Sequence, residues 1–410
     1  MHRWQQKSLG EFIELKRGYD LPSRDRVPGD FPLVTSSGPT EFISQSKAKG
    51  PGVVTGRYGT VGQVFYVQKD FWPLNTALYV RDFRGNSPRF VYYFLHGIDW
   101  EKFNDKSGVP GINRNDVHRE PVFVPPLDQQ KQIVSVLGAL DDKIELNRRM
   151  NETLETMAQA IFRDWFVDFG PVRRRLDGTT DPVAIMGGLL PDPARAAELA
   201  GLFPDGLGDD ELPLGWEAGD FGDLATTSGE SVDPTLLRED TPYIGLEHMP
   251  RRSIALDSWD FAGKVSSQKS RFAIGQVLFG KLRPYFHKVG IAPVDGVCST
   301  DIVVLDSRGE FDRELVTCCA SSDAFVAFTD ITSTGTKMPR TSWSHMKTYA
   351  LAIADAPVRR AFSSLVRPMH QKVVGSVAEN RTLAETRDYL LPRLMSGEVR
   401  VGDIDQSGTI

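Results

Sequence analysis

The sequence predicts a mixed α+β protein with two globular units in tandem, each followed by one long helix. Three observations lead to this prediction. The second half of the chain repeats the first at offsets between 210 and 229 residues. Each copy ends in a segment whose apolar residues recur with a period of seven residues. Each copy also begins with short β-like runs, among them GPGVVTG, ALYV, AIGQVLF and DIVVLD, separated by Gly- and Pro-rich turns.

The repeat emerges when the second half is aligned on the first. Trp4 falls on Trp216 at an offset of 212, and Gly56-Arg57 falls on Gly280-Lys281 at an offset of 224. From about residue 112 to residue 163 the offset is 229 without a gap. Because a chance alignment would not hold one register over that length, we interpret the two halves as diverged copies of one unit.

The end of each copy predicts a long helix, at 127–170 and at 354–400, and a proline stands near the start of each. Apolar residues recur there in alternating steps of four and three, which is the narrow seam that two packed helices share. Arg387 interrupts the second seam. The residues assigned to the seam and to partner docking are Ile144, Asn151, Leu154, Ile161, Val373, Asn380, Leu383 and Leu390.

Each helix could pack on its own unit, or the two could pack on each other. Asn151 and Asn380 occupy the same seam position, 229 residues apart. A buried polar residue in a seam commonly sets the register of two helices, which favours packing of the helices on each other.

The remaining segments are assigned by composition. Residues 1–126 and 214–353 are predicted to be the globular units, and 401–410 a tail. Residues 171–213 contain many Pro, Gly and Asp residues, so we expect a linker with one short helix at 193–201.

Charge and cysteine content bound the class of protein. The net charge is −6, but the acidity is concentrated in 177–220, with one Arg against ten acids, whereas 1–126 has 17 basic and 13 acidic residues. A local basic surface is therefore compatible with the net charge. No run of 18 apolar residues and no signal sequence is present, and three cysteines show no metal spacing, so we expect a cytoplasmic protein with reduced thiols.

Known catalytic motifs are not found. GQVLFGKL at 275–282 resembles a phosphate-binding loop, but Leu282 stands where a hydroxyl would hold magnesium, and VLF is typical of a strand. The sequence has no GxSxG, no HExxH and no Asp/Asn-Pro-Pro-aromatic loop, and its histidines lack metal spacing. We therefore expect no catalytic residue, no metal and no cofactor in this chain.

Two similar modules on paired helices would bind two sites at a fixed separation, as DNA half-sites are bound. Candidate reading elements are turns with basic, aromatic and hydroxyl residues; the alternative is that these are ordinary turns with solvated charges. The candidate DNA-contacting residues are Ser36, Ser37, Arg57, Tyr58, Thr60, Arg114, Lys281, Arg283, Tyr285, His287, Lys288, Lys337 and Arg340.

Three runs resemble a known family. PPLDQQKQIVSVLGALDDKIELNRRMNETLETMAQAIFRDWFVDF is similar to the central conserved region of type I restriction-modification specificity subunits. GRYGTVGQVFYVQKDFWPLNTALYV and LRPYFHKVGIAPVDGVCSTDIVVL resemble motifs of their target recognition domains. The order of domain, helix, domain and helix matches as well.

The resemblance implies two target recognition domains in pseudo-twofold tandem, with the helices forming an antiparallel coiled coil. Each domain would read one half of a split, asymmetric site in double-stranded DNA. The helices would dock two modification (methyltransferase) subunits, which use S-adenosylmethionine, and restriction subunits would add chemistry that depends on ATP and Mg. Two alternatives are a protein-binding scaffold with repeated modules and an enzyme with an unrecognised site.

Overall fold

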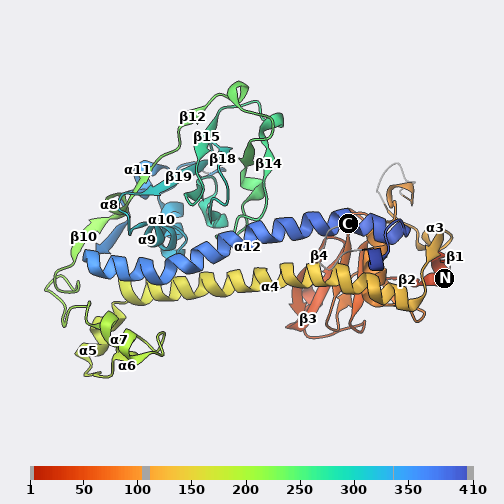
Figure 1. Ribbon diagram of the computed structural model, residues 1–410, viewed down its shortest axis with the longest axis horizontal. Helices are drawn as coiled ribbons and strands as arrows, with labels where there is room; N and C mark the ends of the chain where they lie inside the picture. The colour runs from red at the N-terminus through yellow and green to blue at the C-terminus, as the bar shows by residue number, and fades with distance from the viewer. Residues whose placement is uncertain (1–3, 104–110, 336, 404–410) are drawn as a thin grey trace. The chain divides into compact units, whose positions relative to one another are not determined.

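Figure 1 shows a computed structural model of the chain, which describes residues 4–103, 111–335 and 337–403. The chain divides into two compact units. Unit 1 contains Met1–Lys143 and Leu383–Ile410, and unit 2 contains Ile144–Thr382. Each unit is described by itself below.

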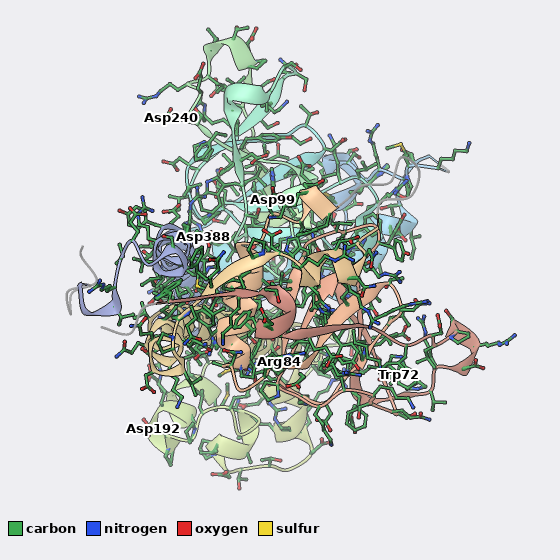
Figure 2. The ribbon with its side chains drawn as sticks, turned by 90° about the vertical axis from the view of Figure 1, so that its right-hand side faces the viewer. Trp72, Arg84, Asp99, Asp192, Asp240 and Asp388 are labelled. Atoms are coloured by element: carbon green, nitrogen blue, oxygen red, sulfur yellow. The ribbon has the colours of Figure 1, made fainter. Side chains whose placement is uncertain are left out.

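Unit 1 is built on two small sheets. The first is antiparallel in the order β2-β8-β5-β6, and the second has the order β4-β3-β7, in which β3 and β7 are parallel. Trp72 lies buried in β7 (Figure 2). Its elements are β1 (Gln5–Ser8), α1 (Leu9–Phe12), β2 (Glu14–Arg17), β3 (Pro28–Thr35), β4 (Gly38–Ile43), β5 (Gly52–Gly56), β6 (Val64–Val67), β7 (Trp72–Pro73), β8 (Ala77–Asp82), α2 (Pro88–His96), α3 (Arg114–His118) and β9 (Pro121–Val124).

Unit 2 repeats this plan with a larger second sheet. Its first sheet has the order β11-β19-β16-β17, and its second has the order β12-β15-β18-β13-β14. Its elements are β10 (Glu217–Asp220), α8 (Phe221–Leu224), β11 (Ala225–Thr227), β12 (Ser231–Val232), β13 (Pro242–Ile244), β14 (Asp260–Phe261), β15 (Lys269–Phe272), β16 (Val277–Gly280), β17 (Val289–Ile291), β18 (Gly296–Ser299), β19 (Ile302–Ser307), α9 (Arg313–Ala320), α10 (Asp323–Ile331), α11 (Trp343–Met346) and β20 (Ala350–Ile353).

The two units share the strand order of their first sheets, and the order β4-β3-β7 corresponds to β14-β13-β18 in the larger second sheet of unit 2. In each unit the first strand after a short capped helix starts a four-stranded antiparallel sheet, and the second sheet contains one parallel pair. The outer pairs β1·β9 and β10·β20 also correspond. The tandem repeat that the sequence predicts is therefore confirmed at the level of the fold.

Two long helices close the repeats: α4 (Leu127–Phe166) and α12 (Ala356–Ser396). Both cross the boundary between the units. In unit 1, Arg387 pairs with Asp141 at 2.8 Å. In unit 2, Phe162 lies against Phe362 with ring centroids 6.5 Å apart. Residue numbers rise along α4 while they fall along α12, so the paired helices are antiparallel within each unit.

The polar residues of the seam show its register. Asn147 Nδ2 donates to Asn380 Oδ1 at 2.8 Å, and both side chains are buried. Asn151 and Asn380 are equivalent in the repeat, but the partner of Asn380 is Asn147. The reason is geometric: equivalent residues of an antiparallel pair lie on opposite sides of its local two-fold axis and do not face each other. Arg387 leaves the seam intact, because its ion pair with Asp141 satisfies its charge.

The other seam residues are mostly buried. Ile144, Ile161, Val373 and Leu390 are buried, whereas Leu154 and Leu383 are half-buried. The apolar seam is thus shielded from water along most of both helices, which accounts for much of the stability of helices that are otherwise highly charged.

The segment predicted to be a linker is instead folded. Residues 170–213 contain α5 (Gly170–Leu176), α6 (Pro182–Ile185) and α7 (Pro193–Ala200). Each helix has Pro in its first turn, and Asp181 and Asp192 cap two of them (Figure 2 labels Asp192). Val172, Met186 and Leu199 are buried in the core of unit 2. The predicted short helix at 193–201 is confirmed as α7, whereas the remainder is folded and not a linker, because its Pro and Asp residues mark helix starts.

An aromatic cluster joins this insert to the helices. Trp165 of α4 is 1% exposed and contacts Phe203 at 5.0 Å and Phe362 of α12 at 6.0 Å between ring centroids. Such aromatic pairs add to the free energy of burial.

Cys298, Cys318 and Cys319 are buried free thiols. Among the described residues, no helix has the length and apolar character needed to cross a membrane.

Candidate nucleic-acid interface

In unit 1 the candidate site is built around Arg57, which directly follows strand β5. Its backbone N–H donates to the carbonyl of Thr76 at 3.0 Å, and its carbonyl accepts from Ile112 N–H at 3.1 Å. Tyr58 then forms a bridge with Gly111. The Arg57 guanidinium lies 4.4 Å from the centroid of the Tyr58 ring. Both backbone polar groups of Arg57 are therefore satisfied, and its side chain is oriented by the Tyr58 ring and by a hydrogen bond from Nε to the Ile112 carbonyl at 3.4 Å.

In unit 2 a corresponding set of backbone contacts surrounds Lys281, which directly follows strand β16. We call this set of contacts the frame of the basic residue. Its N–H donates to the carbonyl of Asp301 at 2.9 Å, and its carbonyl accepts from Thr341 N–H at 3.0 Å. Leu282 forms a bridge with Arg340, as Tyr58 does with Gly111. The offset of 224 residues relates Arg57 to Lys281, and the offset of 229 relates Ile112 to Thr341, whereas Asp301 lies one residue beyond Thr300, the counterpart of Thr76. This confirms the predicted equivalence of Arg57 and Lys281.

Glycines make the turn after Arg57 possible. Gly59 and Gly62 have φ of 77° and 81°, a region that favours glycine. A Cβ on Gly111 would lie 2.2 Å from the Tyr58 ring, so only glycine lets the ring approach this closely. The Thr60 hydroxyl donates to the Ser36 carbonyl and so ties the turn to the β3–β4 connection.

A cleft of about 560 Å³ lies beside Arg57 and Tyr58. Its lining adds Arg114, which is exposed at the start of α3. It also adds Lys16, Arg17, Tyr19 and Asp20, which sequence reasoning missed. The signal was available in ELKRGYD, where a strand with two basic residues runs into a Gly-aromatic turn. Four cationic side chains against one carboxylate make this cleft suitable for phosphate or guanine edges.

Tyr19 is held at the cleft by its hydroxyl. Lys16 Nζ donates to Tyr19 Oη at 3.2 Å, and the hydroxyls of Tyr19 and Tyr79 are 3.1 Å apart. The hydrogen bonds from Tyr79 and Lys16 lower the pKa of Tyr19, and burial raises the pKa of Tyr79. Tyr79 is therefore the donor that fits this pair, and Tyr19 the acceptor.

Ser36 and Ser37 lie in the turn between β3 and β4. Ser36 is half-buried and its N–H donates to Thr76 Oγ1 at 3.3 Å. Ser37 is exposed, and its hydroxyl is 3.0 Å from that of Thr35. Ser36 therefore supports the Arg57 turn, while Ser37 is accessible to a ligand.

In unit 2 the loop after Lys281 is rigid and strongly bent. Arg283 and His287 both adopt left-handed backbone conformations, with φ of 51° and 52°, on either side of a 3-10 turn at Pro284–Phe286. Arg283 N–H donates to the Pro339 carbonyl at 2.7 Å, which ties this loop to the one that carries Lys337 and Arg340. The loop therefore presents its side chains in a fixed arrangement.

The candidates of this loop separate into outward and inward groups. Tyr285 is 50% exposed, and Lys337 and Arg340 are exposed. Arg340 lies 3.3 Å from Asp301, so part of its charge is neutralised. Lys281 and Arg283 are half-buried.

His287 and Lys288 point inward. His287 is buried, and its Nε2 lies 2.8 Å from the Ser321 carbonyl. Lys288 Nζ donates to the Leu246 carbonyl, and burial, followed by nearby Arg251, lowers its pKa. Both side chains are therefore held by backbone carbonyls in this structure, and their contact with DNA stays a prediction. A single sequence does not show which residues of a tight turn face the core.

Within the described part of the chain, no cluster of His, Cys, Asp and Glu is arranged to hold a metal ion. Residues 275–282 contain strand β16, so the resemblance to a phosphate-binding loop is accidental.

The fold and this interface define a class: a tandem-repeat recognition protein with a basic turn at the same strand end of both repeats. Comparisons with known proteins show which recognition proteins this chain resembles. Residues 1–156 match the family model described as the type I restriction modification DNA specificity domain. The specificity subunit of the type I restriction enzyme MjaIX of Methanocaldococcus jannaschii is 24% identical over 77% of this chain and 70% of its own length.

The specificity subunit of HindI of Haemophilus influenzae is 25% identical over 76% of this chain and 77% of its own length. The crystal structure of a type I restriction-modification S subunit from M. genitalium shares the fold, with a TM-score of 0.58 at 13% identity over 96% of both chains. Over about three quarters of its length the chain is thus similar to specificity subunits of type I restriction enzymes, and residues 1–156 match the family's domain model.

Proposed function

We propose that this chain is the DNA sequence-specificity subunit of a type I restriction-modification complex and that it reads a bipartite, asymmetric site. One observation carries the proposal. Arg57 and Lys281 follow equivalent strands, and each is held by two backbone hydrogen bonds to corresponding segments of its unit. Each repeat therefore offers one basic side chain at the same place, as expected when each repeat reads one half-site.

The differences between the two frames support unequal half-sites. Arg57 has a forked guanidinium, which matches two acceptors of guanine, whereas Lys281 has a single ammonium group. Gly111 in unit 1 corresponds to Arg340 in unit 2, so the second frame has an additional cation where the first has no side chain. Identical bases are not expected to satisfy both frames.

The proposed partners rest on the similarity to type I specificity subunits. We propose that the helices dock two modification subunits, which would bind S-adenosylmethionine and methylate adenine. Restriction subunits would join them and use ATP and Mg. On this proposal the chain itself contributes no catalytic group and works in the cytoplasm, where its DNA is.

Methylation in cells tests the proposal most directly. The chain is coexpressed with its modification subunits, and methylated adenines are mapped across the genome. We expect one split motif with two different halves. In Arg57→Ala the first half should lose discrimination by about 1–3 kcal/mol at one base pair, and in Lys281→Ala the second half should do so.

Glu101→Gln is a suitable control for the first half, because this exposed glutamate is not among the residues that line the cleft beside Arg57. A protein-binding scaffold would instead give no methylation motif, and partner binding insensitive to salt. A uniform loss of affinity for all sequences in Arg57→Ala would make Arg57 a phosphate contact.

A further inference from the structure

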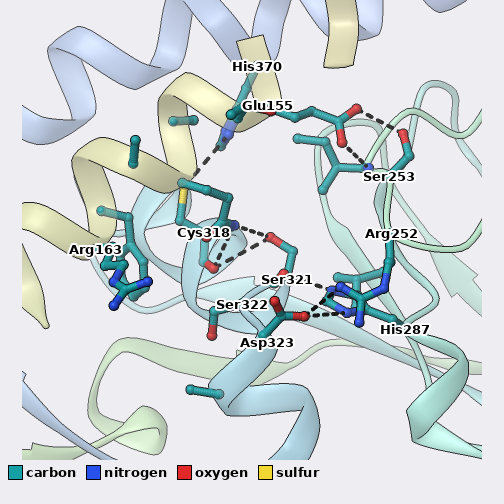
Figure 3. Close-up of a pocket in the computed structure, with 18 of the residues that line it drawn as sticks. Glu155, Arg163, Arg252, Ser253, His287, Cys318, Ser321, Ser322, Asp323 and His370 are labelled. Atoms are coloured by element: carbon teal, nitrogen blue, oxygen red, sulfur yellow. Dashed lines mark hydrogen bonds and ion pairs between the residues drawn. The ribbon is translucent and has the colours of Figure 1, made fainter. Parts of the chain in front are cut away.

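In unit 2, one carboxylate of α4 holds a short segment beside the basic loop. Glu155 accepts hydrogen bonds from Ser253 Oγ and from Ile254 N–H, both at 2.9 Å (Figure 3). Burial raises the pKa of Glu155, and the two donors oppose this rise. A largely buried carboxylate with two donors is a strong and directional contact.

The segment that Glu155 holds is hydrogen-bonded to the end of the basic loop. Arg252 N–H donates to the His287 carbonyl at 2.9 Å, and Ile291 N–H donates to the Ile254 carbonyl at 3.0 Å. The chain between His287 and Ile291 leads directly into β17, the edge strand of the four-stranded sheet. Residues 252–255 therefore connect Glu155 to the base of the loop that starts at Lys281.

The same segment rests on both helices. Ile254 packs with Val373 of α12 and with Leu154 of α4 in one hydrophobic cluster. Three residues after Ile254, the Asp257 carboxylate lies 3.7 Å from the guanidinium of Arg148 in α4. A displacement of α4 in unit 2 would thus be transmitted to residues 252–257.

On its other side the loop borders open space. A cavity of about 870 Å³ is lined by Glu155, Ser253, Arg252 and His287 (Figure 3). Across it, Arg252 pairs with Asp323 at 2.7 Å, and His287 bonds to the Ser321 carbonyl. On this side the loop is therefore held by the contacts of Arg252 and His287 with residues 321–323.

We propose that Glu155 is a positioning residue for recognition at the second half-site: through Ser253 and Ile254 it couples the conformation of α4 to the basic loop of unit 2. Given the DNA-reading role proposed above, discrimination by Lys281 and Arg283 depends on this carboxylate, and discrimination by Arg57 does not. The equivalent position in the repeat, Ala384, has no carboxylate, so the coupling belongs to one half-site.

The test uses the full chain assembled with its modification subunits. Methylation rates are measured on the mapped site and on two duplexes, each with one mismatched base pair in one half. We expect Glu155→Met, which keeps the length but removes both acceptors, to lower discrimination at the second half roughly tenfold, the scale of one charged hydrogen bond. Discrimination at the first half should change less than about twofold.

Three variants sharpen the result. Glu155→Gln keeps an acceptor for Ile254 N–H and should restore most of the discrimination. Ser253→Ala removes one donor and should give a smaller loss at the same half. Glu152→Gln, an exposed glutamate that lines the same cavity, is the matched control and should have no effect.

An equal loss at both halves in Glu155→Met, or unchanged discrimination at the second half, would overturn the positioning role. If Glu155→Met does not assemble, Ser253→Ala decides in the same way. The proposed function fails separately: in that case Arg57→Ala and Lys281→Ala would also leave both halves of the motif unchanged.

Discussion

Units 1 and 2 share their strand order but attach to the long helices through different chemistry. In unit 1, Arg89 of α2 forms a two-pronged ion pair with Asp142 of α4, at 2.7 and 2.9 Å. In unit 2, Glu314 of α9 pairs with Arg367 of α12 at 3.1 Å and accepts from Ser363 at 2.7 Å. The charged residue that faces the long helix is therefore an arginine in unit 1 and a glutamate in unit 2.

The difference teaches that the backbone plan and the contacts that stabilise it can diverge independently. Helices α2 and α9 follow equivalent strands, β8 and β19, so topology places a helix there in both units. The side chains at the contact are free to change provided that charge is matched. Burial differs as well: the Asp142 side chain is 63% exposed, whereas that of Glu314 is 4% exposed.

The largest effect is expected where unit 2 has an element of its own. Trp165→Ala should remove the contact between α4, the insert at 170–213 and Phe362, and should destabilise unit 2 by about 3–5 kcal/mol. Hydrogen exchange should rise within Ile144–Thr382 and much less in the sheet of unit 1. The exposed Leu214→Ala is the control, and equal exchange in both units would show that they unfold together.

A smaller change in stability is expected from removing the ion pairs that connect each unit to its long helices, and the change should differ between the units. Arg367→Ala leaves the buried Glu314 carboxylate with Ser363 as its remaining partner here, at a cost of about 3 kcal/mol. Arg89→Ala leaves Asp142 in water and should cost at most about 1 kcal/mol. Urea denaturation of both variants measures the difference, and equal costs would contradict the role assigned to burial.

The pH dependence should also differ. Burial lowers the pKa of His370 from 6.5 to about 4, so the folded protein keeps this imidazole neutral where the unfolded chain binds a proton. Unit 2 is therefore fully stabilised above pH 6.5 and loses roughly 3 kcal/mol as the pH falls towards 4. In His370→Leu this part of the profile should be flatter. An unchanged slope would assign the pH dependence to other groups.

The smallest effect concerns the seam that the two repeats share. Asn380→Ala removes the acceptor of Asn147 Nδ2, which then keeps Glu379 as a partner. We expect a loss of about 1 kcal/mol in thermal unfolding. Asn151→Ala should cost less, because the Asn151 Oδ1 atom has no hydrogen-bond partner among the described residues. The reverse order would contradict the register.

Much of the fold could be predicted because both copies of the repeat show the same periodic spacing of apolar residues. The alternation of steps of four and three predicts long helices, and the observed bounds, Leu127–Phe166 and Ala356–Ser396, differ by a few residues from those expected. The linker prediction was wrong because Pro and Asp near helix starts have the same composition as a loop.

The site was predictable only in part. The offset pairs Arg57 with Lys281, and their shared backbone frame confirms this pairing. Lys16 and Tyr19 were missed because a sheet brings a distant strand beside the turn. The burial of His287 could not be predicted either, because its side chain contacts the Ser321 carbonyl, which is distant in the chain.

The sequence by itself determined the tandem repeat, the two long helices and the equivalence of two basic turns, because periodicity and register are properties of the chain alone. Only the tertiary structure decided that Asn380 faces Asn147, that 170–213 is folded, and which loop cations remain exposed. These features depend on contacts between residues distant in the chain, and such contacts form only when the apolar faces of both repeats are buried.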